Sequence, residues 1–455
     1  MNRKFIAKKV GLKVYDNIRG LNVSKYLKLY IKTIEWSRDK IINYQTRKLK
    51  ELLIYSYENV PFYKKRFDEA GFSPDSFKYL DQLNVLPPLT KKDLRNNQNT
   101  LFSIEKNKFT IFKGASSGST GEPAVFYHDE HGKSSNRAAI IFGKFLGGYR
   151  LGNPWINIWG NPNTVNKEWT KLTSKASKFI FNEIPFPAYR LNTSHEYGNL
   201  YNLFLNKKPL FIYGYTNAVY LFAKFLEENK LTINKVKGVF PTSEKLMEFQ
   251  KLTMENHLGK VYDQYGSSEV NGIAAESIYD DYFSIIDPHV FVEFIDVYKD
   301  TNAKKILVTH LDNKVFPLIR YDNGDLAEPV DDSIRSYTLN YSKIKSIDGR
   351  VSDIIKLPDG GNLVLPSFFG GGMFKNVAGV KQYQIVQYAP GKLRINLVIN
   401  QSFNEKSKTT IINTLNNYLP KSLEFNLVFN HKIINSKTGK FKLFIDETLL
   451  DIREI

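Results

Sequence analysis

Three short apolar segments that end beside glycine or proline constrain the fold of this chain most strongly. They read WINIWG at 155–160, LFIYG at 210–214 and VKGVF at 236–240. Runs of this length bounded by turn residues are typical of strands buried on both faces, as in a parallel sheet. Between the last two, residues 217–230 have the apolar spacing of an amphipathic helix. Strand–helix–strand at this spacing predicts an α/β fold.

The segment 282–325 follows a different pattern. Its apolar and polar residues alternate, which predicts antiparallel strands with one solvated face. A break is expected near 346–353. After the break, residues 380–398 predict two strands, and a helix at 407–419 and a strand at 423–430 follow.

These patterns divide the 455 residues into two predicted domains. Residues 1–348 would form a large N-terminal domain with mixed and parallel sheets flanked by helices. Residues 349–455 would form a small, mobile α+β domain. Residues 1–100 are expected to be mainly helical, and Thr90 has the character of an N-cap that starts a helix.

The composition excludes several classes of protein. The chain has no cysteine, so disulfides, thiolate metal sites and cysteine nucleophiles are excluded. None of its 7 histidines stands in an H-E-x-x-H motif. No apolar run reaches the roughly 18 residues of a membrane span, and the N-terminus lacks the apolar stretch of a secretory signal, so a cytoplasmic protein is expected.

The net charge of +18 is concentrated at the N-terminus. Residues 1–50 hold 14 lysines and arginines and three acids, which leaves +11 in that segment. Such an arm either contacts an anionic membrane or only keeps the N-terminus solvated, and the second interpretation is favoured. No nucleic-acid partner is expected.

The segment 114–123, GASSGSTGEP, is the strongest local motif. It combines three glycines with four hydroxyl side chains, so its backbone amides and hydroxyls can surround phosphate oxygens. A plain surface loop is the alternative. A nucleophile elbow is disfavoured because Pro123 and the strand-like 125–127 follow, where the elbow requires a helix. A Walker A loop is disfavoured because Tyr127 stands where its first glycine is required before 132–134.

Two further motifs combine turn residues with carboxylates. YDQYGSSE at 262–269 places an aromatic ring, a glycine and a carboxylate close together, as a base, a phosphate and Mg²⁺ would require. PLIRYDNGD at 317–325 ends in an aspartate after Asn-Gly and could bind two ribose hydroxyls. Asn-Gly is also a strong hairpin signal, so a simple β-hairpin turn is the alternative for the second motif.

Two last motifs, DGRVSD at 348–353 and SKTGK at 436–440, would each be interpreted as surface if taken alone. Together and in this order, the five motifs resemble the adenylate-forming superfamily of acyl-CoA synthetases and adenylation domains. Within it the chain is most similar to the branch of phenylacetate–CoA ligases and CapK-type capsule-biosynthesis proteins. The N-terminal segments VPFYKKRFDEAGF and LNVLPPLTKKDLRNN, together with YGSSEV and PLIRYDNGD, carry this narrower resemblance, which covers about residues 55–450.

The resemblance implies a nucleotide-binding role for most of the motifs. It assigns the ATP phosphates to a loop of Ser116, Ser117, Gly118, Ser119, Thr120 and Gly121. It places Ser243 and Glu244 in the segment of the adenine pocket, Tyr265 beside the adenine, and Gly266 and Ser267 among the nucleotide-binding residues. Asp325 would hold the ribose hydroxyls, and Arg350 would contact ribose or phosphate.

The resemblance also implies two catalytic residues. Glu269 would coordinate Mg²⁺, and Lys440 would bridge the substrate carboxylate and the α-phosphate of ATP. The flanks of Lys440 depart from the family pattern, so Lys437 and Lys442 are rivals. The hinge of the small domain usually carries an acid, and Ser352 replaces it here.

The implied reaction joins a carboxylic acid to ATP and then passes the acyl group to CoA or to an amine. The acid pocket is expected near Tyr213, Tyr215, Phe240, Gly272, Ile273 and Ala274, and the acid itself is left open. A homodimer is allowed. The alternative is a non-catalytic or peripheral membrane assembly protein that keeps the fold.

Overall fold

The structure is a computed structural model of the chain. The description below covers residues 11–115, 124–160, 172–191, 193–296, 302–330, 338–350, 354–359, 362–364, 377–419, 421–430, 433 and 444–449. The first ten residues of the basic arm therefore lie outside the described residues.

The N-terminal region is built from helices. They are α2 (Leu12–Arg19), α3 (Val23–Thr33), α4 (Arg38–Asn59), α5 (Pro61–Glu69), α6 (Lys91–Asn96) and α7 (Gln98–Leu101). The predicted cap at Thr90 is confirmed: its Oγ1 accepts a hydrogen bond from the Asp93 amide at 3.1 Å, and the Asp93 carboxylate accepts one from the Thr90 amide at 2.8 Å. This reciprocal pairing satisfies amide groups that the first turn of α6 leaves without helical partners.

One 12-stranded mixed sheet forms the centre of the molecule. Its strand order is β11-β12-β13-β14-β10-β9-β8-β6-β5-β3-β4, and β7 pairs with β6 off this path. The parallel half consists of β3 (Trp155–Trp159), β4 (Glu183–Pro187), β5 (Phe211–Tyr215), β6 (Val236–Thr242) and β7 (Gly259–Val261). The three apolar segments of the sequence are strands β3, β5 and β6, so the parallel arrangement predicted for them is confirmed.

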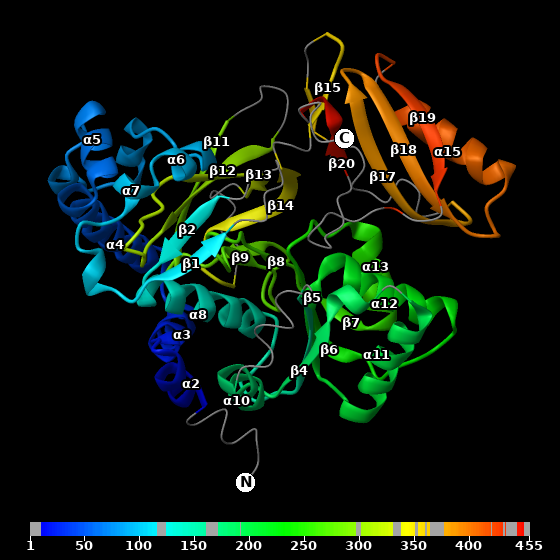
Figure 1. Ribbon diagram of the computed structural model, residues 1–455, viewed down its shortest axis with the longest axis horizontal. Coiled ribbons are helices and arrows are strands. Elements are labelled where there is room, and N and C mark those ends of the chain that lie inside the picture. The colour runs from blue at the N-terminus through cyan, green and yellow to red at the C-terminus, as the bar shows by residue number, and fades with distance from the viewer. Residues whose placement is uncertain are drawn as a thin grey trace.

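Helices cover both faces of this parallel half. The helices of this lobe are α8 (Glu130–Leu146), α10 (Leu172–Ile180), α11 (Ser194–Lys207), α12 (Thr216–Glu228) and α13 (Glu248–His257). Side chains from α11, α12 and α13 form one core with Ile156, Ile212 and Val239 of the sheet. Figure 1 shows α8 on the opposite side of β5 and β6 from α12. Successive strand residues point to opposite faces, so Trp155, Phe211 and their neighbours two positions along face α8.

The other half of the sheet is antiparallel, as 282–325 predicts. It contains β8 (Gln264–Tyr265), β9 (Ala274–Ala275), β10 (Phe283–Ile285), β11 (Val290–Ile295), β12 (Lys304–His310), β13 (Tyr321–Pro329) and β14 (Lys343–Arg350). A separate hairpin of β1 (Phe112–Ala115) and β2 (Val125–His128) lies beside α8 (Figure 1). Its strands flank the glycine- and serine-rich segment of the sequence.

A four-stranded sheet forms the C-terminal part, with β17 (Val380–Ala389), β18 (Lys392–Ile399), β19 (Glu424–Asn430) and β20 (Phe444–Asp446). Helix α15 (Glu405–Tyr418) covers it, and β15 (Ile354–Lys356) pairs with β16 (Asn362–Val364). These elements have their own apolar core. This core contacts the N-terminal part of the chain at Phe249 of α13, whose ring centroid lies 6.5 Å from that of Tyr383. Short 3₁₀ helices occur at Pro74–Ser76, Leu80–Val85, Lys106–Lys108, Ala188–Arg190 and Glu447–Leu449.

The predicted fold class is confirmed: mixed α/β sheets flanked by helices, with a smaller α+β part at the C-terminus. The boundary between 348 and 349 stays a prediction, because residues 351–353 lie outside the described part. Within the described ranges, no helix combines the length and the apolar character needed to cross a bilayer.

Candidate functional site

The two halves of the large sheet meet at β8, which is only two residues long. Gln264 pairs in parallel with Thr242 of β6, and Gln264 and Tyr265 pair antiparallel with β9. In open α/β sheets, ligands bind at the carboxyl ends of strands where the topology changes. The motif 262–269 therefore lies at the position where this sheet is most suited to form a site.

Two residues assigned to the nucleotide from sequence lie in direct contact here. The Tyr265 hydroxyl donates a hydrogen bond to Oδ2 of Asp325 at 2.9 Å and accepts one from Nδ2 of Asn323 at 2.8 Å. The structure thus brings together an aromatic ring and a carboxylate that are 60 residues apart in the chain.

The segment Asn323–Gly324–Asp325 is a bulge within β13 and not the hairpin turn that Asn-Gly alone would predict. The pairing of β13 with β12 jumps from Asp322 opposite Leu307 to Leu326 opposite Lys305. Gly324 adopts a φ of 81°, which a residue with a side chain rarely takes. The bulge aims Asp325 at Tyr265, and bulges next to functional sites commonly redirect a side chain in this way.

Glu269 is buried, with 3% of its surface exposed. Its Oε1 accepts a hydrogen bond from the hydroxyl of Tyr321 at 2.8 Å. Burial and the charge of Glu269 raise the pKa of Tyr321 well above its usual value, so the phenol stays protonated and keeps donating. In the described part of the chain, the second oxygen of Glu269 has no hydrogen-bonding partner.

This arrangement fits the magnesium role implied for Glu269. Mg²⁺ is usually held by one or two carboxylates together with substrate phosphates and waters. A single carboxylate with one engaged and one available oxygen meets that requirement. The described residues contain no group of three or more candidate metal ligands, so phosphate oxygens and waters would have to complete the coordination.

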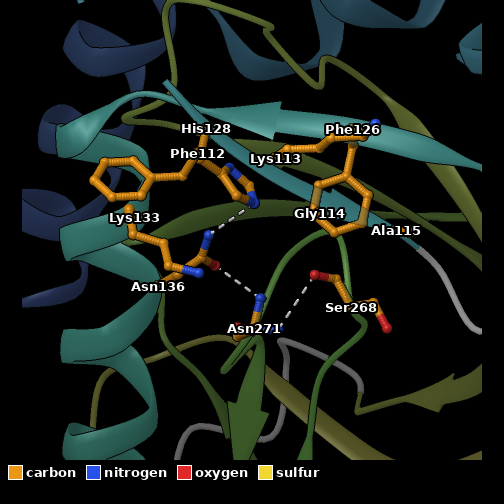
Figure 2. Close-up of a pocket in the computed structure, with 10 residues that line it drawn as sticks. All are labelled: Phe112, Lys113, Gly114, Ala115, Phe126, His128, Lys133, Asn136, Ser268 and Asn271. Atoms are coloured by element: carbon orange, nitrogen blue, oxygen red, sulfur yellow. Dashed lines mark hydrogen bonds between the residues drawn. The ribbon is translucent and has the colours of Figure 1, made fainter. Parts of the chain in front are cut away.

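A pocket of roughly 210 Å³ lies between the β1–β2 hairpin, the start of α8 and the loop after β8. Figure 2 shows Lys113 and Gly114 above it and Ser268 and Asn271 below it. Lys133 of α8 also lines the pocket, so two lysines give it a positive potential suited to phosphate groups.

Gly114, which begins the glycine- and serine-rich segment, is packed tightly in this pocket. A side chain on Gly114 would collide with the ring of Phe126 across the hairpin, and Figure 2 shows this ring beside Gly114. The strand predicted after the loop is present as β2, which also disfavours a nucleophile elbow.

The loop after β8 packs against α8. Oδ1 of Asn136 accepts a hydrogen bond from the Asn271 amide at 2.7 Å. Gly272 has a φ of 64°, and a Cβ there would stand 2.8 Å from the backbone carbon of Ala139. His128 lies beside Asn136, and burial lowers its pKa to about 3, so its imidazole is neutral.

The N-terminus of α8 is occupied by protein groups. Asp129 caps the helix by accepting from the Gly132 amide at 2.7 Å, and its other oxygen accepts from the Lys314 amide at 2.7 Å. Residues 132–134 therefore belong to a capped helix, which also disfavours a Walker A loop.

Ser243 and Glu244 follow the carboxyl end of β6, next to β8. Ser243 is exposed and has a φ of 72°, a strained value for a residue with a side chain. The Glu244 carboxylate accepts a hydrogen bond from the Asn217 amide at the start of α12 at 2.7 Å. Their assignment to an adenine pocket stays a prediction.

The Cα atom of Arg350 is paired with that of Asp325 across β13 and β14, which places the residue at the same end of the sheet. The conformation of its side chain lies outside the described part. Three further predictions also lie outside the described residues: the loop Ser116–Gly121, the hinge residue Ser352, and Lys440 with its rivals Lys437 and Lys442.

The residues expected in the acid pocket lie in two places. Tyr213, Tyr215 and Phe240 stand on the sheet face that α8 covers, while Ile273 and Ala274 are buried beside β8. The sequence analysis missed Trp159, whose ring stands 4.2 Å from that of Tyr215 and 5.6 Å from that of Tyr213. The alternation of aromatic residues in WINIW and FIYGY could have indicated this shared aromatic face.

Comparisons with known proteins find relatives in sequence and in fold. Residues 361–447 match the family described as the CapK C-terminal domain. The protein CapK of Staphylococcus aureus is 25% identical over 431 residues, which are 93% of each chain. A phenylacetate–coenzyme A ligase of Escherichia coli is 26% identical over 364 residues, 70% of this chain and 73% of the other.

The resemblance to the adenylate-forming superfamily is confirmed. A solved 2-hydroxyisobutyryl-CoA ligase in its postadenylation state, in complex with 2-HIB-AMP, superposes with a TM-score of 0.68 at 20% identity and 88% coverage of both chains. An anthranilate CoA ligase in complex with anthranoyl-AMP superposes with a TM-score of 0.50 at 12% identity, over 71% of this chain and 64% of the other. At these identities the superpositions show that the fold is shared.

Proposed function

We propose that this chain is an ATP-dependent carboxylate ligase that forms an acyl-adenylate and then transfers the acyl group to coenzyme A or to an amine. The observation that supports it best is the convergence of Tyr265, Asp325 and Glu269 at the junction of the sheet, next to a lysine-lined pocket. Phenylacetate–CoA ligases among the relatives favour coenzyme A as the acceptor.

In the first step, a carboxylate oxygen of the acid attacks the α-phosphorus of ATP. A P–O bond forms, the bond to the bridging oxygen breaks, and pyrophosphate leaves. The acid is already ionised at neutral pH, so no protein base is required in this step. The chain must instead hold several anions together, and this requires positive charge and oriented donors.

The chain's own residues supply these requirements in defined places. Tyr265 provides a ring for the adenine, and Asp325 keeps carboxylate lone pairs for the ribose hydroxyls. Lys113 and Lys133 attract the phosphates electrostatically. Glu269 would hold Mg²⁺, which when bound neutralises charge on the phosphate oxygens.

In the second step, a thiol or amine attacks the acyl carbon and forms a C–S or C–N bond. The acyl C–O bond to the phosphate breaks, AMP leaves, and the proton of the thiol or amine is released to solvent. Lys440 is proposed to act in the first step by bridging the carboxylate and the α-phosphate. The Lys440→Ala variant should lose adenylation by about 100-fold or more while ATP binding persists. Lys437→Ala and Lys442→Ala serve as comparisons, and adenylation near the wild-type rate in Lys440→Ala would assign the role to one of them.

ATP–pyrophosphate exchange with Mg²⁺ and a panel of aryl, aliphatic, amino and uronic acids tests the proposed function. Exchange that depends on one class of acid is expected, and product analysis after adding coenzyme A or amines then identifies the acceptor. If the chain binds ATP but no acid supports exchange, the non-catalytic alternative is preferred.

A further inference from the structure

A cluster of charged side chains beneath α8 has no role in the nucleotide site. Arg137 and Lys144 stand seven residues apart on α8, so they lie on the same face of the helix. Asn157 of β3, Glu183 of β4 and Tyr213 of β5 belong to the strands next to this helix face. We call these five residues the basic cluster.

Lys144 is the most unusual member of the basic cluster because it is 3% exposed. Its Nζ stands 3.8 Å from the centre of the Trp155 ring and 4.7 Å from that of Tyr213. Within the described part of the chain, its ammonium has no hydrogen bond or ion pair. Burial and the nearby Arg137 lower its pKa to about 7, although Glu183 acts in the opposite direction.

Two polar atoms of the basic cluster are buried without a hydrogen-bonding partner among the described residues. They are Nε of Arg137 and Oδ1 of Asn157. Asn157 uses its Nδ2 to donate to Glu183 at 2.7 Å. Buried polar groups without partners are rare and costly, so such a group calls for a ligand or a water.

The charges of the basic cluster do not balance. Arg137 and Lys144 bring two basic groups against the single carboxylate of Glu183. The side chains of Arg137, Asn157, Glu183 and Tyr213 are also only partly buried, although they stand between a helix and a sheet. Part of each of these side chains is therefore accessible to a water-sized molecule.

The basic cluster is linked to the candidate site through Thr242. Tyr213 contacts Thr242 of β6, and the Thr242 hydroxyl donates to the Gln264 carbonyl at 3.1 Å, one residue before Tyr265. On α8, Arg137 follows Asn136, which lines the pocket drawn in Figure 2. The aromatic face of Trp159, Tyr213 and Tyr215 lies on the same side of the sheet.

We propose that the basic cluster binds a second anionic group of the acid substrate, so that this chain activates dicarboxylic acids. This inference rests on the proposed function. One carboxylate would meet ATP, while the other would accept hydrogen bonds from the guanidinium of Arg137 and pair with Lys144. The aromatic face would pack against the carbon skeleton between them.

Lys144 then acts as a charge-selective binding residue. A bound carboxylate favours its charged form and offsets the cost of its burial. An acid with a methyl group in the place of the second carboxylate leaves Arg137 and Lys144 without a partner. Sites built around buried polar groups discriminate strongly against ligands that fail to pair them.

Matched pairs of acids in ATP–pyrophosphate exchange test this proposal: glutarate against valerate, adipate against hexanoate, and terephthalate against 4-methylbenzoate. At least one dicarboxylate should exceed its monocarboxylate partner by tenfold or more in kcat/KM. Arg137→Gln and Lys144→Met should each reduce that preference at least tenfold, because kcat/KM should fall far more with the dicarboxylate than with the monocarboxylate. Lys175→Met, an exposed lysine of α10, is the control and should leave the preference unchanged.

Calorimetric binding of the same acids, in the presence of a non-hydrolysable ATP analogue, gives a readout besides activity. Dicarboxylate affinity should fall as the pH rises from 6.5 to 8.5, because Lys144 loses its proton, and Lys144→Met should flatten this dependence. Faster exchange with monocarboxylates than with every dicarboxylate would overturn this inference and keep the proposed function. Dicarboxylate binding without exchange would overturn the proposed function and keep the anion site, and the absence of both would overturn both.

Discussion

The proposed nucleotide side of the site consists of Tyr265, Asp325 and Glu269. It differs from the basic cluster beneath α8 in how the protein pairs its charged groups. On the nucleotide side, Glu269 accepts from Tyr321 and Asp325 accepts from Tyr265, so each carboxylate is fixed by a tyrosine hydroxyl. In the basic cluster, Lys144 faces aromatic rings and Nε of Arg137 has no described partner. The carboxylates of the first region are held by hydrogen bonds within the protein. The second region has buried polar atoms that no described residue pairs, so a ligand could bind them.

The largest effect on activity is expected from the Glu269→Gln variant. It removes the negative charge proposed to hold Mg²⁺, and exchange at saturating acid should fall by about 100-fold, together with a higher Mg²⁺ requirement. Tyr321→Phe keeps that charge and is the matched control, with a loss below about tenfold. A Mg²⁺ titration that is the same for Glu269→Gln and wild type would remove Glu269 from the metal role.

The next largest effect is expected from Gly272→Ala, which tests the packing of the loop after β8 on α8. The new Cβ would stand 2.8 Å from the backbone of Ala139, in a conformation with a φ of 64°. The free energy of unfolding should fall by about 2–4 kcal/mol. Gly324→Ala is the matched control, because its φ is 81° but no atom lies within 4 Å of the added Cβ.

Chemical denaturation of both glycine variants measures this difference. Gly324→Ala should lose only about 1 kcal/mol, from backbone strain alone. Equal losses in the two variants would show that contact with Ala139 does not hold the loop.

The Lys144→Met variant should stabilise the ligand-free protein at neutral pH, in contrast to the variants on the nucleotide side. The pKa of Lys144 is lowered to about 7 in the folded protein and is near 10.5 when unfolded. Between these values the unfolded chain binds the additional proton, so the stability of the wild type rises with pH in that window. The advantage of Lys144→Met should therefore be about 1–2 kcal/mol near pH 7 and should shrink toward pH 9.

Thermal melts of both proteins at pH 6.5, 7.5 and 9.0 measure this effect. Lys175→Met should follow the wild type at every pH. A difference between Lys144→Met and wild type that grows with pH would contradict a depressed lysine pKa.

The smallest effect is expected from Tyr265→Phe. The ring remains for the adenine, but Asp325 loses a hydrogen bond of 2.9 Å. The KM for ATP should rise by about three- to tenfold, which corresponds to roughly 1 kcal/mol, with kcat little changed. A fall in kcat with an unchanged KM would place Tyr265 in the chemical step.

Much of the fold was predictable because local pattern and final structure agree. The apolar segments at 155–160 and 210–214 are parallel strands, and the alternating segment at 282–325 is antiparallel. Thr90 caps α6 as its sequence context requires. The contact between Tyr265 and Asp325 joins two residues to which the resemblance assigned nucleotide roles, and those roles stay predictions.

The basic cluster could not be predicted, because its members come from four separate elements. Arg137 and Lys144 lie in a helix whose apolar and polar residues look ordinary, and Glu183 starts a short strand that was not expected. Only the pairing of β3 with both β4 and β5 brings Glu183 and Tyr213 to either side of Asn157. The bulge at Gly324 was also missed, since Asn-Gly predicts a hairpin turn unless the neighbouring strands are known.

The two-residue strand β8 is shared by both regions, since Gln264 accepts from Thr242 on one side and is followed by Tyr265 on the other. We expect a displacement of β6 by an acid bound in the basic cluster to reach β8, the strand that carries Tyr265. If the bound acid raises the affinity for ATP by some factor, bound ATP raises the affinity for the acid by the same factor, because the coupling free energy between two ligands is reciprocal. Equilibrium titrations of one substrate at several fixed concentrations of the other thus measure this coupling free energy.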